Sequence, residues 1–180
     1  MSEEMRNENE VFASVRGVIL QGLQYFNVEG FDVRRFAQAN FNHGDGLVLM
    51  NLVDTERAGW QSCKYVMKDL GLTRADEWIE IQTYQISTIK RMRPDDTVDT
   101  ITAEDVATRL ISWFNGVGME ELRKIGLSSF LIDPNSIIVY NDDSDLYQRR
   151  PVFEVKIIVN KKFSVGQPDV DILGVRTKPI

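Results

Sequence analysis

The chain has 180 residues, of which 43% are hydrophobic and 27% are charged, as is typical of a globular protein with one core. Its net charge of -6 argues against a dedicated nucleic-acid-binding protein, because such proteins usually carry a basic surplus. The single cysteine, Cys63, excludes a disulfide within the chain and fits a reducing compartment. The polar, acidic start is not a secretory signal, and no apolar run is long enough to span a bilayer. We therefore expect a protein made in the cytoplasm, without membrane contact.

An amphipathic helix is predicted near the N-terminus, from about Asn9. Its apolar residues follow helical spacing: Val11, Phe12, Val15, Val18, Ile19, Leu23 and Phe26. Gly17 and Gly22 each weaken such a helix by roughly 1 kcal/mol relative to alanine. The alternative is that they allow the helix to pack closely against a sheet. The residues before this helix, 1–9, are predicted to be a flexible end.

Strands are predicted over residues 31–38 and 46–56, with the turn-rich sequence NHGDG between them. Residues 60–68 are ambiguous by period and are interpreted as a further strand. Residues 77–92 are long, β-branched and aromatic, which indicates a strand. The apolar face changes from Ile79 and Ile81 to Tyr84 and Ile86, which predicts a bulge or a change of environment.

A second helix is predicted to begin at Thr102, where a threonine is followed three residues later by Asp105, as in a capping box. Asn115 and Gly116 are predicted to end it. A short helix with Met119, Leu122 and Ile125 and a strand over residues 136–140 are predicted to follow. This order predicts an α/β (α+β) fold with an antiparallel or mixed sheet and helices packed on it. We expect one domain over residues 10–173 and a C-terminal arm over residues 174–180.

The last predicted strand alternates clearly between apolar and polar residues. Phe153, Val155, Ile157 and Val159 share one face, which is predicted to pack against the helix that carries Val106, Leu110 and Phe114. Arg149, Arg150 and Pro151 come just before this run. One interpretation is an edge strand whose charged, proline-marked start limits unwanted pairing. The other is a simple exposed entry to the strand.

No reaction class follows from the residues. His43, the only histidine, lies in a turn composition and is interpreted as a solvated loop residue, and Cys63 as a buried, inert thiol. The acidic sequence NDDSD (141–145) lacks the glycine and the glutamate of a calcium-binding EF-hand loop and is interpreted as a solvated turn. We expect no catalytic, cofactor-binding or metal-binding residues.

Two pairs of arginines are the remaining candidates for contacts: Arg34 with Arg35, and Arg149 with Arg150. Alternation along a strand places the two members of each pair on opposite faces. Each pair is either a surface charge with a packed stem or a contact with an acidic partner.

The order of these segments resembles that of the tail terminator proteins of long-tailed bacteriophages. The N-terminal helix is followed by GLVLMNLVDTERAGW, then by the strand WIEIQTYQISTIKRM, the helix TAEDVATRLISWF and the late strand DLYQRRPVFEVKIIVNKKF. The resemblance covers residues 9 to 173, whereas the segment 61–68 departs from it. It rests on order and polarity, so no functional side chain carries over from the family.

The resemblance implies a non-enzymatic virion protein that forms a six-membered ring, caps the tail tube and joins it to the neck or head connector. The alternatives are another phage neck or head-completion protein, or a small cellular ligand-binding or enzyme domain. The ring would let DNA pass without binding it, and acidic side chains could line the channel. The candidates for this lining are Asp95, Asp96, Asp99, Asp142, Asp143 and Asp145. The arginine pairs are candidates for the contact between subunits.

Overall fold

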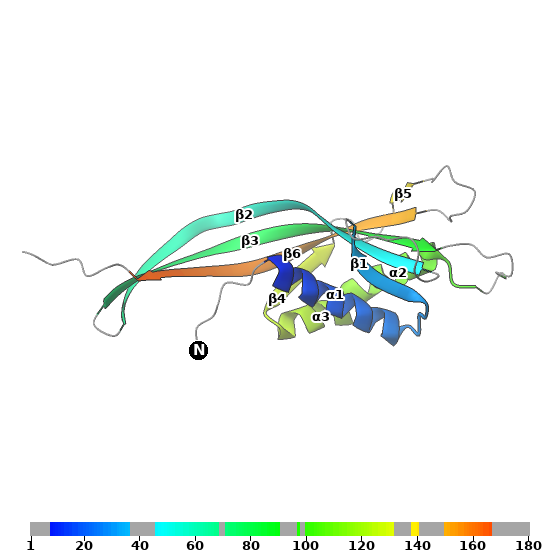
Figure 1. The fold of residues 1–180 in the computed structure, drawn as a ribbon, viewed down its shortest axis with the longest axis horizontal. Coiled ribbons are helices and arrows are strands. Elements are labelled where there is room, and N and C mark those ends of the chain that lie inside the picture. The colour runs from blue at the N-terminus through cyan, green and yellow to red at the C-terminus, as the bar shows by residue number, and fades with distance from the viewer. Residues whose placement is uncertain are drawn as a thin grey trace, which may run out of the picture.

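A computed structural model describes residues 8–36, 46–68, 71–90, 97, 100–131, 138–140 and 150–166. Along these residues lie three helices and six strands (Figure 1). The helices are α1 (Glu8–Tyr25), α2 (Ala103–Phe114) and α3 (Val117–Lys124). The strands are β1 (Phe31–Arg35), β2 (Gly46–Lys68), β3 (Gly71–Lys90), β4 (Leu127–Leu131), β5 (Ile138–Tyr140) and β6 (Arg150–Gly166).

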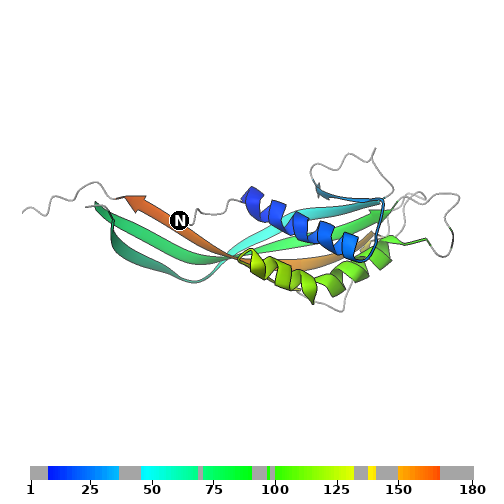
Figure 2. The same cartoon turned by 90° about the horizontal axis from the view of Figure 1, so that it is seen from below.

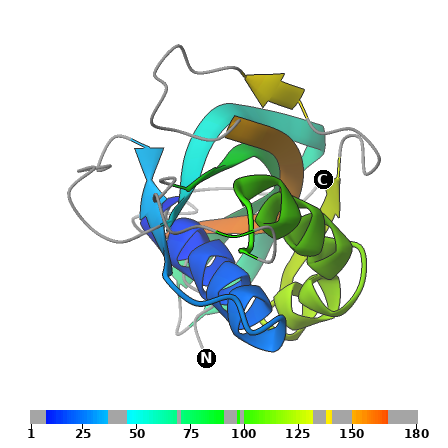
Figure 3. The same cartoon turned by 90° about the vertical axis from the view of Figure 1, so that its right-hand side faces the viewer.

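All six strands belong to one mixed sheet in the order β1-β2-β3-β6-β4, with β5 also paired to β6. The β1–β2 pair is parallel, and the other pairs are antiparallel. Seen along the long axis of the molecule, the helices lie together on one side of the curved sheet (Figure 3). The predicted fold class, an antiparallel or mixed sheet with helices packed on it, is confirmed, and the sheet is the mixed one of the two alternatives.

The face of β6 that meets the helices is the predicted one. Phe153, Val155, Ile157 and Val159 are all buried in the main core, together with Val106, Leu110 and Phe114 of α2. The rings of Phe114 and Phe153 lie 6.5 Å apart between centroids. Because side chains alternate across a strand, a single register places all four β6 residues under the helices. The prediction for this strand is confirmed.

Helix α2 begins where its capping sequence predicts. The Thr102 side chain accepts a hydrogen bond from the Asp105 backbone N–H, and the Asp105 carboxylate accepts one from the Thr102 backbone N–H. The two side chains thereby satisfy donors that the first turn of a helix leaves without partners. At the other end Asn115 is the C-cap, with its N–H donated to the Ile111 carbonyl. Both predicted ends are confirmed.

Trp113 holds the three helices together, although no sequence pattern singled it out. Its indole Nε1–H donates to the Val18 carbonyl of α1 at 3.0 Å. A methyl group at Gly22 would lie 2.8 Å from the Trp113 ring, and one at Gly118 would lie 2.5 Å from it. Gly22 therefore permits close packing, but against a tryptophan of α2 rather than against a sheet, so the predicted partner was wrong. Gly17 has no such neighbour.

The two glycines of α1 should respond to alanine in opposite ways. Gly17→Ala is expected to raise the free energy of unfolding by up to about 1 kcal/mol, because alanine favours the helix and meets nothing there. Gly22→Ala is expected to lower it by about 1–2 kcal/mol, since the new methyl group overlaps the indole and overpacking outweighs the gain in propensity. Urea unfolding of both variants measures the difference. Equal stabilisation by the two substitutions would contradict the packing of Trp113 against Gly22.

Several strands differ from the sequence prediction. Residues 46–56 and 60–68 belong to one long strand, β2, whose register against β3 shifts between Leu52 and Asp54 and between Ala58 and Ser62. The short strand β4 was not predicted. The bulges lie on β2 and not on β3, which pairs with β6 in unbroken register from Thr73 to Ser87. The predicted change of environment along β3 is confirmed, because Tyr84 and Ile86 are fully buried whereas Ile79 is 42% exposed.

Three strands continue well past the helices and form an arm, defined here as residues 53–68 of β2, 71–81 of β3 and 160–166 of β6. Figure 1 shows these strands extending away from the helices, and Figure 2 shows that no helix covers them. The pairing of β2 with β3 and of β3 with β6 runs almost to the end of the arm. The molecule thus consists of a helix-covered body and a bare, three-stranded arm.

Candidate assembly surfaces

The described residues offer no cluster of three or more histidine, cysteine, aspartate and glutamate side chains that could hold a metal ion. His43 lies outside these residues. So do the acidic candidates Asp95, Asp96, Asp99, Asp142, Asp143 and Asp145, and the turn 141–145. The candidate functional sites among the described residues are therefore surfaces, namely the edges of the sheet and the arm.

Cys63 is exposed, so the prediction of a buried thiol was wrong. It lies in the arm, where no helix is present to cover it. Asp76 is its partner in the ladder, and Arg74 donates to the Asp76 carboxylate at 3.0 Å. Burial raises the pKa of Asp76, but the hydrogen bonds from Arg74 and Cys63 outweigh it and hold that pKa below its usual range. Burial of Cys63 was predicted from its apolar neighbours in the sequence. It would have required a helix over this part of the sheet, and no helix covers the arm.

Arg34 and Arg35 lie on opposite faces of β1, as alternation predicted. Arg34 donates to the Asp32 carboxylate at 2.7 Å. Arg35 lies over the Phe12 ring of α1, 4.2 Å from its centroid, and donates to the Asn9 side chain at 2.7 Å. Each guanidinium therefore already has a partner within its own chain. A role of either one in contacts between subunits stays a prediction.

The start of β6 is not the edge of the sheet, so the edge-strand interpretation was wrong. β6 pairs with β3 on one side and with β4 and β5 on the other. Pro151 is buried and lies opposite Val139 of β5, one residue before the pairing with β3 begins at Val152. A proline is tolerated there because the β3 ladder needs no donor from it. The simple exposed entry is also wrong, since Pro151 is covered.

Arg150 is used inside the chain. It donates to the Ser87 hydroxyl of β3 at 3.1 Å, and its guanidinium lies 5.1 Å from the centroid of the Phe36 ring. It therefore anchors the first residue of β6 to β3 and to the segment after β1. Arg149 lies outside the described residues. A test of this pair as a contact should therefore reverse Arg149 alone, because reversal of Arg150 would also remove contacts within the fold.

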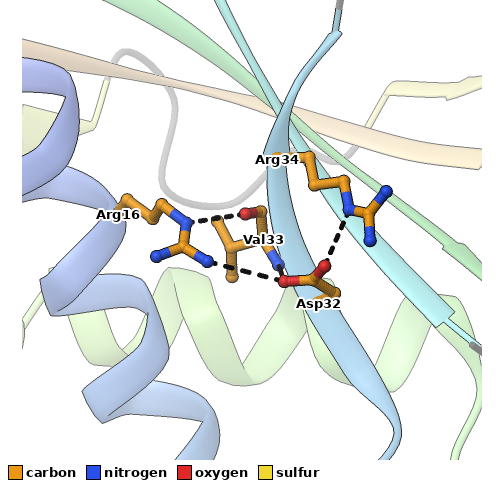
Figure 4. A network of polar contacts seen from close by, with 4 residues as sticks. All are labelled: Arg16, Asp32, Val33 and Arg34. Carbon is orange, nitrogen blue, oxygen red and sulfur yellow. Dashed lines mark hydrogen bonds and ion pairs between the residues drawn. The ribbon is translucent and has the colours of Figure 1, made fainter. Parts of the chain in front are cut away.

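β1 is one edge of the sheet and β4 is the other, and at Val33 of β1 side chains occupy the outer backbone groups (Figure 4). Arg16 of α1 donates from Nε to the Val33 carbonyl at 2.8 Å, while the Val33 N–H donates to the Asp32 carboxylate at 2.8 Å. The hydrogen bond from Arg34 holds the pKa of Asp32 below its usual range. An edge strand with free N–H and C=O groups invites pairing with another chain. At Val33 both groups are already satisfied.

The low pKa of Asp32 predicts a contribution to stability that depends on pH. The folded state lowers this pKa below its unfolded value near 4, so the contribution is fully present above that value. It is lost as pH falls through the folded pKa. Asp32→Asn, which keeps an acceptor for the Val33 N–H, should therefore lose less stability than the unsubstituted protein between about pH 5 and pH 2. Urea unfolding across this range measures the two curves, and parallel curves would contradict the role of Asp32.

Polar side chains replace the apolar core where the sheet leaves the helices. Tyr84 donates to the Gln82 side chain at 2.9 Å, Gln82 donates to Glu80 at 2.7 Å, and Glu80 pairs with Lys161 at 3.6 Å. Burial raises the pKa of Tyr84, so its hydroxyl stays protonated and remains a donor. The row runs along the face that carries the helices in the body. It ends the core and leaves the arm without an apolar layer of its own.

The arm instead exposes single apolar side chains: Val53, Trp60, Tyr65 and Ile79. Trp60 is the extreme case at 99% exposed, and it lies in the second bulge of β2. Exposed aromatic side chains are typical anchors of protein interfaces. The sequence prediction missed this feature, because residues 46–56 and 60–68 were interpreted as two strands. The break between these two predicted strands contains Gly59 and Trp60, and a glycine next to a tryptophan there could have indicated a bulge with an exposed aromatic side chain.

Most of the chain, including the body and the arm, matches a known protein family. The family model described as E217 gateway protein gp29 matches residues 10–166. The chain belongs to this family. The match runs from α1 to the end of β6, and so includes both the body and the arm. No curated protein matches the chain.

Membership of the gateway protein family makes this chain a phage structural protein of the neck or tail-completion type. This agrees with the broader part of the resemblance noted from the sequence. The family match does not extend to the tail terminator family itself. Among the described residues, no helix is long and apolar enough to cross a membrane. Among the described residues, the arm is a surface that the helices of the chain leave bare (Figure 2).

Proposed function

We propose that this gateway-family protein acts by assembly and not by catalysis. It closes into a ring, most simply a hexamer, that caps the end of the tail tube and joins it to the neck or head connector. It is made in the host cytoplasm and incorporated into the virion at the neck. The arm carries this proposal, because a three-stranded extension with no covering layer and with exposed aromatic side chains offers a surface that another subunit can bury.

The protection of β1 supports a specific ring over open aggregation. A ring requires one head-to-tail contact that closes by rotation, whereas free strand edges allow pairing in many registers. In the body the edge at Val33 is occupied by Asp32 and Arg16. Pairing with another chain in many registers is thereby disfavoured at this edge.

A second candidate is a different neck or head-completion component. The matching family is described as a gateway protein and not as a tail terminator, and this favours a position between the connector and the tail. Both candidates share a ring made of this chain. They differ in whether loss of the protein changes the length of the tail tube.

Electron microscopy distinguishes the tail-capping function from the second candidate. The purified protein, alone and with tail tubes, is examined by negative-stain electron microscopy, and virions are prepared without it. Rings at the tube end, together with tubes of irregular length and unjoined heads in its absence, would support the tail-capping function. Tubes of normal length that fail to join heads would favour the second candidate. Normal tails attached to heads would contradict both.

The proposal also predicts that the ring lets DNA pass without holding it. With a net charge of -6 the chain should repel phosphates, wherever its acidic loops lie. We expect no tight binding of double-stranded DNA at physiological salt in a fluorescence anisotropy titration. Tight binding that weakens steeply as salt rises would contradict a passive channel.

A further inference from the structure

Trp60 is placed at the surface of the arm by the backbone itself. The register between β2 and β3 breaks between Ala58 and Ser62, and Gly59 has a φ of 77°, a left-handed conformation that favours glycine. Bulges of this kind re-aim a side chain out of the regular ladder. Trp60 is 99% exposed, so none of the residues that the structure describes covers the indole.

The body contains a hollow that suits such a side chain. It has a volume of about 370 Å³ and lies beside the first turns of α1. Met50, Leu52 and Tyr84 contribute to its lining from the sheet, and Met50 and Tyr84 are fully buried. Phe12 and Phe36 add two aromatic rings. Binding sites for small ligands start at about 300 Å³, so one large side chain fits a hollow of this size.

The two charged residues of the hollow complement an indole. Arg35 already lies over the Phe12 ring at 4.2 Å, and a guanidinium can stack between two aromatic faces. Glu8, also in the lining, carries a carboxylate that can accept the indole N–H. The ring system of tryptophan has a negative face and a positive N–H edge. A cation and an anion in one hollow match these two features.

We propose that Trp60 of one copy docks into this hollow on the next copy of the same chain. Trp60 belongs to the arm and the hollow to the body, so the contact joins two different surfaces. Such a contact is head-to-tail and repeats from copy to copy until the ring closes. This inference rests on the proposed ring and names the contact that holds it together.

The first test compares two aromatic residues of the same arm. Trp60→Ala should weaken the association between copies on the order of 30-fold or more, as expected for an interface anchor, and rings should disappear in mass photometry. Tyr65→Ala, which removes another exposed aromatic side chain from β2, should leave the rings intact. Both variants should keep the thermal midpoint of the unsubstituted monomer, because Trp60 and Tyr65 both lie at the surface.

The second test identifies the partner surface. The photo-reactive residue p-benzoylphenylalanine replaces Trp60, the assembled rings are irradiated, and cross-linked peptides are mapped by mass spectrometry. Cross-links to peptides of another copy that contain Phe12, Met50, Leu52 or Tyr84 would support the proposal. Cross-links confined to other regions, or none, would overturn it.

A failure of the docking contact can be distinguished from a failure of the ring. If the unsubstituted protein forms rings and Trp60→Ala forms them equally well, the docking contact is wrong while the ring stands. If the unsubstituted protein forms no ring at any concentration and none on tail tubes, the ring is wrong and the contact falls with it.

Discussion

Replacing Phe153 with alanine is expected to lower the free energy of unfolding by about 3–5 kcal/mol. The side chain is 3% exposed and belongs to the main core, where its ring lies 6.5 Å from that of Phe114. β6 is an interior strand between β3 and β4, so the loss leaves a cavity that neighbouring elements fill only in part. Urea unfolding and the thermal midpoint measure the effect.

Phe130→Ala is the matched control for this substitution. Phe130 lies on the neighbouring strand β4 but is 45% exposed, so the same change should cost far less. A thermal midpoint that hardly moves in Phe153→Ala would show that β6 does not present this face to α2.

Trp113→Ala is expected to have an effect of similar size, about 3–5 kcal/mol. The indole is buried where α1, α2 and α3 meet, and its N–H donates to the Val18 carbonyl at 3.0 Å. Alanine removes the ring that Gly22 and Gly118 accommodate, and it also removes the hydrogen bond from the indole to this carbonyl. The free energy of unfolding in urea is again the measurement.

Two further variants separate the causes. Trp113→Phe keeps most of the aromatic packing but loses the N–H donor, so it should lose less stability than Trp113→Ala. Trp60→Ala makes the same chemical change at a 99% exposed position and should alter stability by no more than about 0.5 kcal/mol. Equal losses at positions 60 and 113 would contradict the structure of both the arm and the helix junction.

Trp113 and Trp60 differ in what their side chains contact. Trp113 fastens the helices to one another, so the body is held together by its own contacts. Trp60 has no such partner among the described residues, and the polar row from Tyr84 to Lys161 ends the core before the arm begins. A helix-covered body with a bare arm fits the assembly that we propose for this member of a phage structural protein family.

Features that depend on a single helix or strand could be predicted from the sequence. Thr102 and Asp105 marked the start of α2 because capping is local, and helical spacing predicted α1. Phe153, Val155, Ile157 and Val159 predicted the buried face of β6, since alternation needs no knowledge of the neighbouring strand. The order of these elements also predicted an antiparallel or mixed sheet, and its resemblance to a known phage family predicted the broad class of protein.

Contacts between different elements could not be predicted from the sequence and are known only from the tertiary structure. The partner of Gly22 is Trp113, 91 positions away by number, and no local pattern links the two residues. Cys63 is exposed because it lies in the arm, which no helix covers, and Pro151 is buried in the part of β6 that pairs with β5. Whether a strand lies inside a sheet, at its edge or in an uncovered arm depends on pairing between residues far apart in the chain. Periodicity shows which side chains share a face, but what covers that face is a property of the whole fold.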